Sequence, residues 1–367
     1  MTRRLAVRCL IAPAFLLAAL ASVPQILPVA SPAAAQEEQS PAQQVQALKA
    51  KAQAGDTDAL RQLETLAQSS PQAMAAMGDL YAGGGAVPAD PGKAAEYYSN
   101  ALSRGNKSVR TRLGVLYRDG DGLPANPERA LELLGAGAAE GDGWAMFHLA
   151  QGHLRNRFGR ASRPAEGVKM LEEAIKAGNP QAPAALANLY MWGNGGVARD
   201  PKRAIALLEE AADKGNAVAA RNLVSIYRDG RGKLVPKDPG RAAALLDKYA
   251  TLFDTDALAT EKLLNDSSRS TASTSRDALA ESYRKSDPAA RRRMLLSLRS
   301  GNPVAYVFLV QDRLRAAGKY SGNVNGQLTR STIAAINSFC EEKGITRACR
   351  MGPLSIEGAT ALADALN

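Results

Sequence analysis

The sequence is poor in the residues on which catalytic sites most often depend. It has two histidines, His148 and His153, and three cysteines in 367 residues. No His-Glu-x-x-His, Cys-x-x-Cys or Gly-x-Ser-x-Gly pattern occurs, which excludes the common zinc, redox and serine-hydrolase motifs. Aspartate and glutamate are scattered, and no motif pairs them. We therefore expect no enzyme activity, no cofactor and no metal site.

Aromatic residues are also scarce, at 5% of the chain, whereas alanine and leucine are abundant. This composition favours close-packed helices over a β-sandwich. The apolar stretch from Leu10 to about Val23 is interrupted by Pro13 and is shorter than the ~20 apolar residues of a membrane span. We expect no transmembrane segment in the mature chain.

Residues 1–35 have the layout of a secretory signal peptide. Three arginines precede the apolar stretch, and residues 33–35 are three alanines that form a small-residue cleavage site. Cleavage there lowers the formal net charge from +10 to +7, because three arginines and no acidic residues are lost. We expect a periplasmic protein. Its basic charge is typical of proteins that bind anionic polymers or membranes. The alternative, which is equally favoured, is a soluble envelope protein that is basic without binding either.

Two cysteines, Cys340 and Cys349, remain in the mature chain. A close, even pair in an oxidising compartment predicts a disulfide, and two buried free thiols are the alternative.

Three sequence markers recur every 36 to 38 residues over most of the chain. A glycine followed by Asn or Asp occurs at Gly105-Asn106, Gly141-Asp142, Gly178-Asn179 and Gly215-Asn216. An aromatic position holds Tyr81, Tyr117, His153, Tyr190 and Tyr227. A residue before proline occurs at Asp90-Pro91, Asn126-Pro127, Arg163-Pro164, Asp200-Pro201 and Asp238-Pro239.

Each marker has a physical role in a helical hairpin. Asp or Asn before proline caps a helix start, and glycine followed by Asn or Asp ends one helix and caps the next. The unit is thus a helix A, running from Asn or Asp to the aromatic position, and a helix B, such as Pro201–Lys214, which starts at the proline. Neither helix can bury its apolar face alone, so the units should stack into an α-solenoid.

These markers resemble the Sel-1-like repeat, a relative of the tetratricopeptide repeat. Leu113-Gly114-Val115-Leu116-Tyr117 and Ala211-Ala212-Asp213-Lys214-Gly215-Asn216 fit its pattern, over five units within residues 71–252. The third unit departs most, since His153 replaces Tyr. The resemblance implies a scaffold that mediates protein–protein interactions in the cell envelope, in exopolysaccharide export or its regulation.

The flanks read as degenerate helical units. Ser40-Pro41 and Asp287-Pro288 repeat the helix-start pattern, which predicts N-terminal capping helices over 36–70 and a degenerate repeat over 253–303. Residues 265–276 are rich in Ser and Thr and are expected to form a flexible loop or linker.

Residues 304–367 resemble a small helical peptidoglycan-binding module. Its pattern is matched by Gln311, Leu314, Gly318, Tyr320, Gly322, Val324, Gly326, Thr332, Ala335, Ile336 and Phe339. The resemblance implies wall attachment; the alternative is a retained fold that acts as a cap or a protein contact. If a glycan binds, the expected residues are Tyr320, Asn323, Asn325 and Asn337. Asn325 and Cys340 replace the usual Asp and Gln.

Alignment of helices A predicts a polar stripe along one face, because residues i and i+3 share a helix side. We expect a partner-binding surface there, with a merely solvated face as the alternative. Its residues are Arg112, His148, Gln151, Asn188, Arg221 and Asn222. The basic residues 284–285 and 291–293 suit an acidic polysaccharide or membrane lipid, or form a solvated helix face. Nucleic acid is not expected.

The leading hypothesis is therefore an all-α, non-catalytic periplasmic scaffold or adaptor: an α-solenoid followed by a peptidoglycan-binding-like domain. A second hypothesis is a peptidoglycan-binding protein that uses the solenoid as a spacer. A third, weaker one is a cell-wall hydrolase or its activator.

Overall fold

The structure is a computed structural model that describes residues 40–85, 87–269 and 273–366. The predicted signal peptide, residues 1–35, lies outside them. Every named element in the described part is a helix, which confirms the all-α prediction. The contacts divide the chain after Gln44, so that only the start of α1 belongs to the first unit and the other described residues belong to the second.

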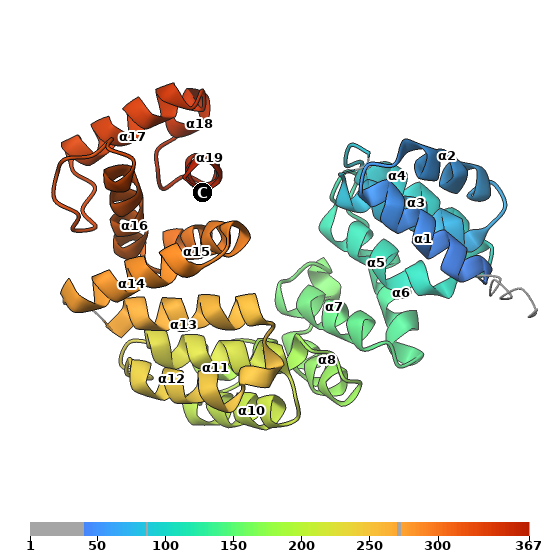
Figure 1. The fold of residues 1–367 in the computed structure, drawn as a ribbon. Helices are drawn as coiled ribbons and strands as arrows, with labels where there is room; N and C mark the ends of the chain where they lie inside the picture. Colours follow the sequence, from blue (N-terminus) through green and yellow to red (C-terminus); the bar gives the residue numbers. More distant parts are fainter. Residues whose placement is uncertain (1–39, 86, 270–272, 367) are drawn as a thin grey trace, which may run out of the picture. The chain divides into compact units, whose positions relative to one another are not determined.

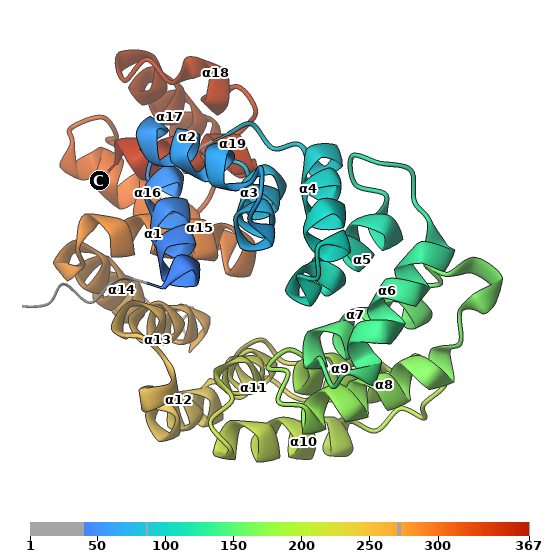
Figure 2. The same ribbon diagram turned by 90° about the vertical axis from the view of Figure 1, so that its right-hand side faces the viewer.

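The predicted hairpins follow one another along the chain, each helix packed on its neighbour in sequence (Figures 1 and 2). The helices A are α3 (Pro71–Gly83), α5 (Arg110–Asp119), α7 (Gly143–Leu154), α9 (Ala182–Trp192) and α11 (Ala217–Asp229). The helices B are α4 (Pro91–Ser103), α6 (Pro127–Ala139), α8 (Pro164–Lys176), α10 (Pro201–Asp213) and α12 (Pro239–Lys248). Before them lie α1 (Pro41–Gln53) and α2 (Thr57–Leu66).

The helices B begin as the sequence predicts. In four of the five, the capping side chain accepts the backbone N–H three residues ahead at 2.9–3.0 Å, and proline follows it. These caps are Asp90, Asn126, Asp200 and Asp238. Arg163 lacks an oxygen for this bond, and its helix starts without a side-chain cap.

The third unit also differs at its aromatic position. In the other four units, the backbone N–H of the capping residue donates to the carbonyl of the tyrosine, at 2.7–2.9 Å. Here the N–H of Arg163 donates instead to Nδ1 of His153, at 3.2 Å. His153 is buried and lies edge-on to Phe158. It is therefore a packed structural histidine.

Asparagines at the starts of helices A bond in two directions. The amide nitrogen of Asn179 donates to the carbonyl of Gly143, 36 residues earlier, and its Oδ1 accepts N–H groups of its own helix. Asn106 and Asn216 make the same pair of contacts with their own neighbours. Each side chain therefore caps one helix A and ties it to the preceding one, an arrangement we call the asparagine tie.

The third unit makes its tie with the opposite polarity. Asp142 occupies the asparagine position, and its side chain has no N–H to donate. The hydroxyl of Thr111 donates to Asp142 Oδ2 at 2.6 Å, while Oδ1 caps the N–H of Trp144. The link between α5 and α7 is thus kept with donor and acceptor exchanged.

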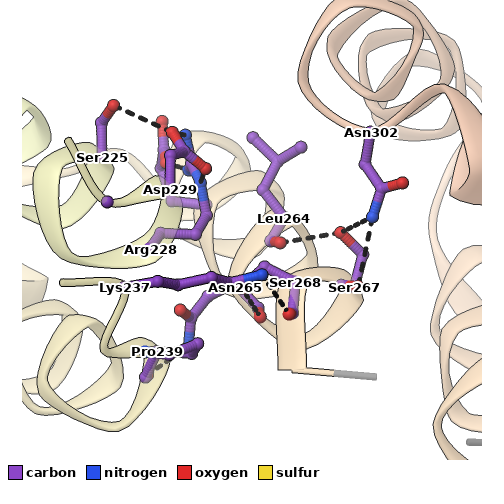
Figure 3. Close-up of polar contacts among 12 residues, drawn as sticks. Ser225, Arg228, Asp229, Lys237, Pro239, Leu264, Asn265, Ser267, Ser268 and Asn302 are labelled. Atoms are coloured by element: carbon purple, nitrogen blue, oxygen red, sulfur yellow. Dashed lines mark hydrogen bonds and ion pairs between the residues drawn. The ribbon is translucent and has the colours of Figure 1, made fainter. Parts of the chain in front are cut away.

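The helical packing continues beyond the five hairpins through α13 (Thr255–Arg269), α14 (Ser273–Lys285), α15 (Pro288–Gly301) and α16 (Pro303–Ala316). The sequence predicts a flexible Ser/Thr-rich linker over 265–276. This prediction is wrong for residues 265–269, which belong to α13, and for residues 273–276, which belong to α14. The hydroxyls of Ser267 and Ser268 donate to carbonyls three residues earlier in α13. Asn302 then donates to the carbonyl of Ser267, which repeats the asparagine tie (Figure 3).

One hydrophobic core extends from Leu263 to Leu366. Its central helix is α16, in which Tyr306, Leu309 and Val310 are almost fully buried. The remaining helices are α17 (Arg330–Glu342), α18 (Thr346–Cys349) and α19 (Ile356–Ala365). The core therefore crosses residue 304, where the sequence predicts a domain to begin. Cys340 and Cys349 form the expected disulfide, with Cα atoms 6.4 Å apart.

Asn179 offers a test of the asparagine tie. Asn179→Asp keeps the capping oxygen but removes the N–H donor to Gly143, so we expect it to lose about 1–2 kcal/mol of unfolding free energy. Asn179→Ala loses cap and tie together and should cost about 2–3 kcal/mol. Urea and thermal unfolding measure both, with the exposed Asn188→Ala as the control. An Asn179→Asp chain as stable as the wild type would contradict the tie.

Candidate partner-binding groove

The structure separates the six residues of the predicted polar stripe. Arg112 and His148 line the same groove, of about 470 Å³. Arg221 lines another hollow of about 480 Å³, where its Nε lies 3.7 Å from Glu261. Gln151 and Asn188 line neither hollow, and Asn222 donates its amide to a carbonyl of its own helix. Only part of the predicted stripe gathers in one place, and a partner-binding surface on helices A stays a prediction.

The groove lies along three successive helices A and the segments beside them. Its walls are Ala82, Tyr98, Ser108, Thr111, Arg112, Val115, Leu116, Asp142, Trp144 and His148. Its lining mixes apolar and polar groups, which is typical of sites that bind a ligand with both an apolar and a polar part.

Arg112 is held only loosely. Its Nε lies 3.4 Å from Oδ1 of Asp79, and its side chain is 49% exposed. The same carboxylate is bonded more closely by Lys49 and by the hydroxyl of Tyr98 at 2.7 Å. Burial and this bond to Asp79 raise the pKa of Tyr98 above its usual range. Because Asp79 is already well paired, Arg112 keeps much of its hydrogen-bonding capacity.

His148 is an uncharged wall of the groove. Its ring stacks on Trp144 with centroids 6.0 Å apart, and Nη1 of Arg118 lies 3.4 Å from its Nδ1. Burial, and then the charge of Arg118, lower the pKa of His148 to about 4. Arg118 itself is held by both oxygens of Asp119 and donates to the backbone carbonyl of His148.

Trp144 is a candidate site residue that the sequence reasoning missed. Its side chain lines the groove and is 45% exposed. The other tryptophan of the chain, Trp192, is also on a helix A and is 48% exposed. Exposed tryptophans are enriched among residues that dominate protein interfaces. The signal was available, since both tryptophans of a chain poor in aromatic residues fall on helices A.

The glycan-binding expectation for Tyr320 is wrong in this structure. Tyr320 is buried, and its hydroxyl donates to the carbonyl of Asn323 at 3.0 Å. It belongs to a polar cluster centred on Gln311, which is fully buried. Gln311 donates to Thr332 and accepts the N–H groups of Asn325 and Gly326. These residues of the predicted peptidoglycan-binding pattern thus shape the loop before α17.

The other predicted glycan residues lie nearer the surface. Asn323 and Asn337 are exposed. Asn325 is half-buried, and its Oδ1 accepts the N–H of Gln327 within the turn. The basic residues of α15 are partly neutralised, because Arg292 pairs with Asp364 and Arg293 with Asp256. No group of three or more metal-ligating side chains occurs within the described ranges. None of the helices described is long and apolar enough to cross a membrane.

The environment of His148 predicts a pH dependence of stability. Its folded-state pKa of about 4 lies below the ~6.5 of the unfolded chain. The unfolded state therefore takes up the proton first, and stability falls as the pH decreases from 6.5 towards 4. The His148→Asn variant keeps an acceptor for Arg118 but has no imidazole to protonate. Between pH 7 and pH 4, we expect its free energy of unfolding to fall by roughly 2–3 kcal/mol less than that of the wild type. Urea titrations at several pH values measure both proteins. If stability falls with pH equally in the wild type and in His148→Asn, the depressed pKa of His148 is contradicted.

The sequence model of the Sel1 repeat matches residues 71–106, 110–142, 180–216 and 217–252. The unmatched hairpin, α7 and α8, is the one that departs in sequence. No curated protein matches the chain. A Sel1 repeat protein from Oxalobacter formigenes is 24% identical, with a TM-score of 0.40, over 67% of this chain and 94% of that chain. A protective antigen of uropathogenic Escherichia coli strains, displaying an SLR fold, is 16% identical, with a TM-score of 0.31, over 86% and 79%. Four stretches of this all-helical chain thus match the Sel1 repeat, and Sel1 repeat proteins generally mediate protein–protein interactions.

Proposed function

We propose that this protein is a non-catalytic periplasmic scaffold that binds a protein of the cell envelope through the groove on its helices A. The observation that carries the proposal is the groove itself, where half-exposed Trp144 and loosely held Arg112 lie together. Both are residue types that dominate binding energy when a partner covers them. Sel1 repeat proteins generally mediate protein–protein interactions, which agrees with this proposal.

The export part of the proposal rests on the sequence and on the cysteines. Residues 1–35 have the signal-peptide layout. The Cys340–Cys349 disulfide is a bond that persists in oxidising compartments. Exopolysaccharide export or its regulation is the envelope process that the resemblance to Sel-1-like proteins suggests.

The absence of catalysis is supported by how the candidate groups are used. His153 accepts a backbone N–H, and His148 faces Arg118. Cys340 and Cys349 are joined to each other and cannot act as thiolate nucleophiles.

Charge reversal on the groove tests the scaffold function. We expect Arg112→Glu to lose the partner recovered by affinity purification from crosslinked envelopes, because it places an anion beside Asp79. Arg221→Glu reports in the same way on the second hollow, which Arg221 lines. The matched control is Arg129→Glu on a helix B, where the arginine is similarly exposed and pairs only with Glu132. Recovery of the same partners by all three variants would refute the proposed surface.

A second candidate function, attachment to peptidoglycan, is favoured by the exposed amides of Asn323 and Asn337. Amide groups suit sugar hydroxyls and N-acetyl groups, and the cluster around Gln311 fixes the loop that carries Asn323. In this reading the solenoid is a spacer that presents the wall-binding module.

Sedimentation with purified sacculi tests wall attachment. Point variants are preferable to deletion of residues 304–367, because that deletion would cut through the core shared by Leu263 to Leu366. We expect the Asn323→Ala, Asn337→Ala double variant to reduce co-sedimentation about tenfold, whereas Tyr320→Phe leaves it unchanged and lowers stability by about 1 kcal/mol. Equal co-sedimentation by the double variant would remove these residues from any wall contact.

A further inference from the structure

The groove walls carry N–H donors that have no partner among the described residues. The contact of Arg112 with Asp79 uses Nε, so both terminal nitrogens of its guanidinium group remain available. Nε1 of Trp144 is likewise without a hydrogen-bond acceptor in the described part of the chain. Trp192 provides the contrast, because its Nε1 donates to Asn188 at 3.1 Å.

His148 adds a third donor through its tautomer. A guanidinium group can only donate, so Nη1 of Arg118 requires Nδ1 of the ring to be an acceptor. The neutral ring then carries its single hydrogen on Nε2. The depressed pKa of His148 is consistent with that uncharged form.

The carboxylate in the groove wall, that of Asp142, is already engaged. The two oxygens of Asp142 accept the N–H of Trp144 at 2.8 Å and the hydroxyl of Thr111 at 2.6 Å. The rest of the lining includes the aliphatic side chains of Val115 and Leu116. The groove is therefore rich in donors and in apolar surface, and it is poor in free acceptors.

We propose that the groove binds an acidic peptide segment of the partner protein, in which a carboxylate lies next to an apolar side chain. The carboxylate pairs with Arg112, since guanidinium and carboxylate form bidentate bonds, and the apolar side chain packs on Trp144. A volume of about 470 Å³ holds a few side chains and not a folded domain. The aliphatic walls favour a peptide over an acidic sugar. This inference rests on the proposed function and specifies its ligand.

The test is selection of a phage-displayed library of random 12-residue peptides on the full chain. We expect enrichment of Asp or Glu beside Leu, Ile or Phe. Selected peptides should bind the Trp144→Ala and Arg112→Glu variants about tenfold or more weakly. They should bind Trp192→Ala, which removes an equally exposed tryptophan, as they bind the wild type. Circular dichroism and melting temperature confirm that each variant is folded.

Titration in the Trp192→Phe background locates the binding, because Trp144 is then the sole tryptophan and its fluorescence reports on the groove. The inference is overturned if no acidic-apolar peptides are enriched, if they bind Trp144→Ala undiminished, or if oligoglucuronate alone changes the fluorescence. The proposed function fails separately, when no envelope partner is recovered. If Arg112→Glu loses the envelope partner but no acidic-apolar peptide is enriched, the peptide inference is overturned and the proposed function remains.

Discussion

The account of the structure depends on a side chain that hydrogen-bonds in two directions at the start of four of the five helices A, which are α5, α7, α9 and α11. Asn179 fixes the position of α9 by capping it and fixes its register on α7 through the carbonyl of Gly143. Helices in a solenoid contact only their neighbours, so any binding surface is the sum of local registers. Because the walls of the groove come from three units, these ties help to set their spacing, together with the apolar packing between the helices.

The third unit is where structural departure and the candidate site coincide. It lies outside the family match, it ties through Asp142 instead of asparagine, and it replaces the aromatic tyrosine by His153. The same hairpin supplies Trp144 and His148 to the groove. The regular units position the helices, and the irregular third unit carries Trp144 and His148, two side chains suited to binding a partner.

Local signals in the sequence predicted much of the fold. Asp or Asn before proline placed the helix B of four hairpins, and the Gly-Asn and Gly-Asp steps placed the helix A of four, because caps and stops act over a few residues. The Ser/Thr-rich run was misread, since composition does not reveal that Ser267 receives a bond from Asn302, 35 residues away. Tyr320 was misassigned for the same reason: its burial depends on Gln311 and Thr332, which a pattern match treats as independent positions. Arg112 and His148 were found by periodicity, but the groove that joins them requires the three-dimensional stacking.

The most direct measurement of the central claim is site-specific photocrosslinking in living cells. A photoreactive amino acid at position 144 probes the groove on the helices A. The same group at position 132 probes an exposed surface of a helix B, because Glu132 lies on α6. If helices A present the binding surface, position 144 gives a discrete adduct with an envelope protein and position 132 gives none. Equal adducts from both positions, or an adduct from position 132 alone, would contradict it.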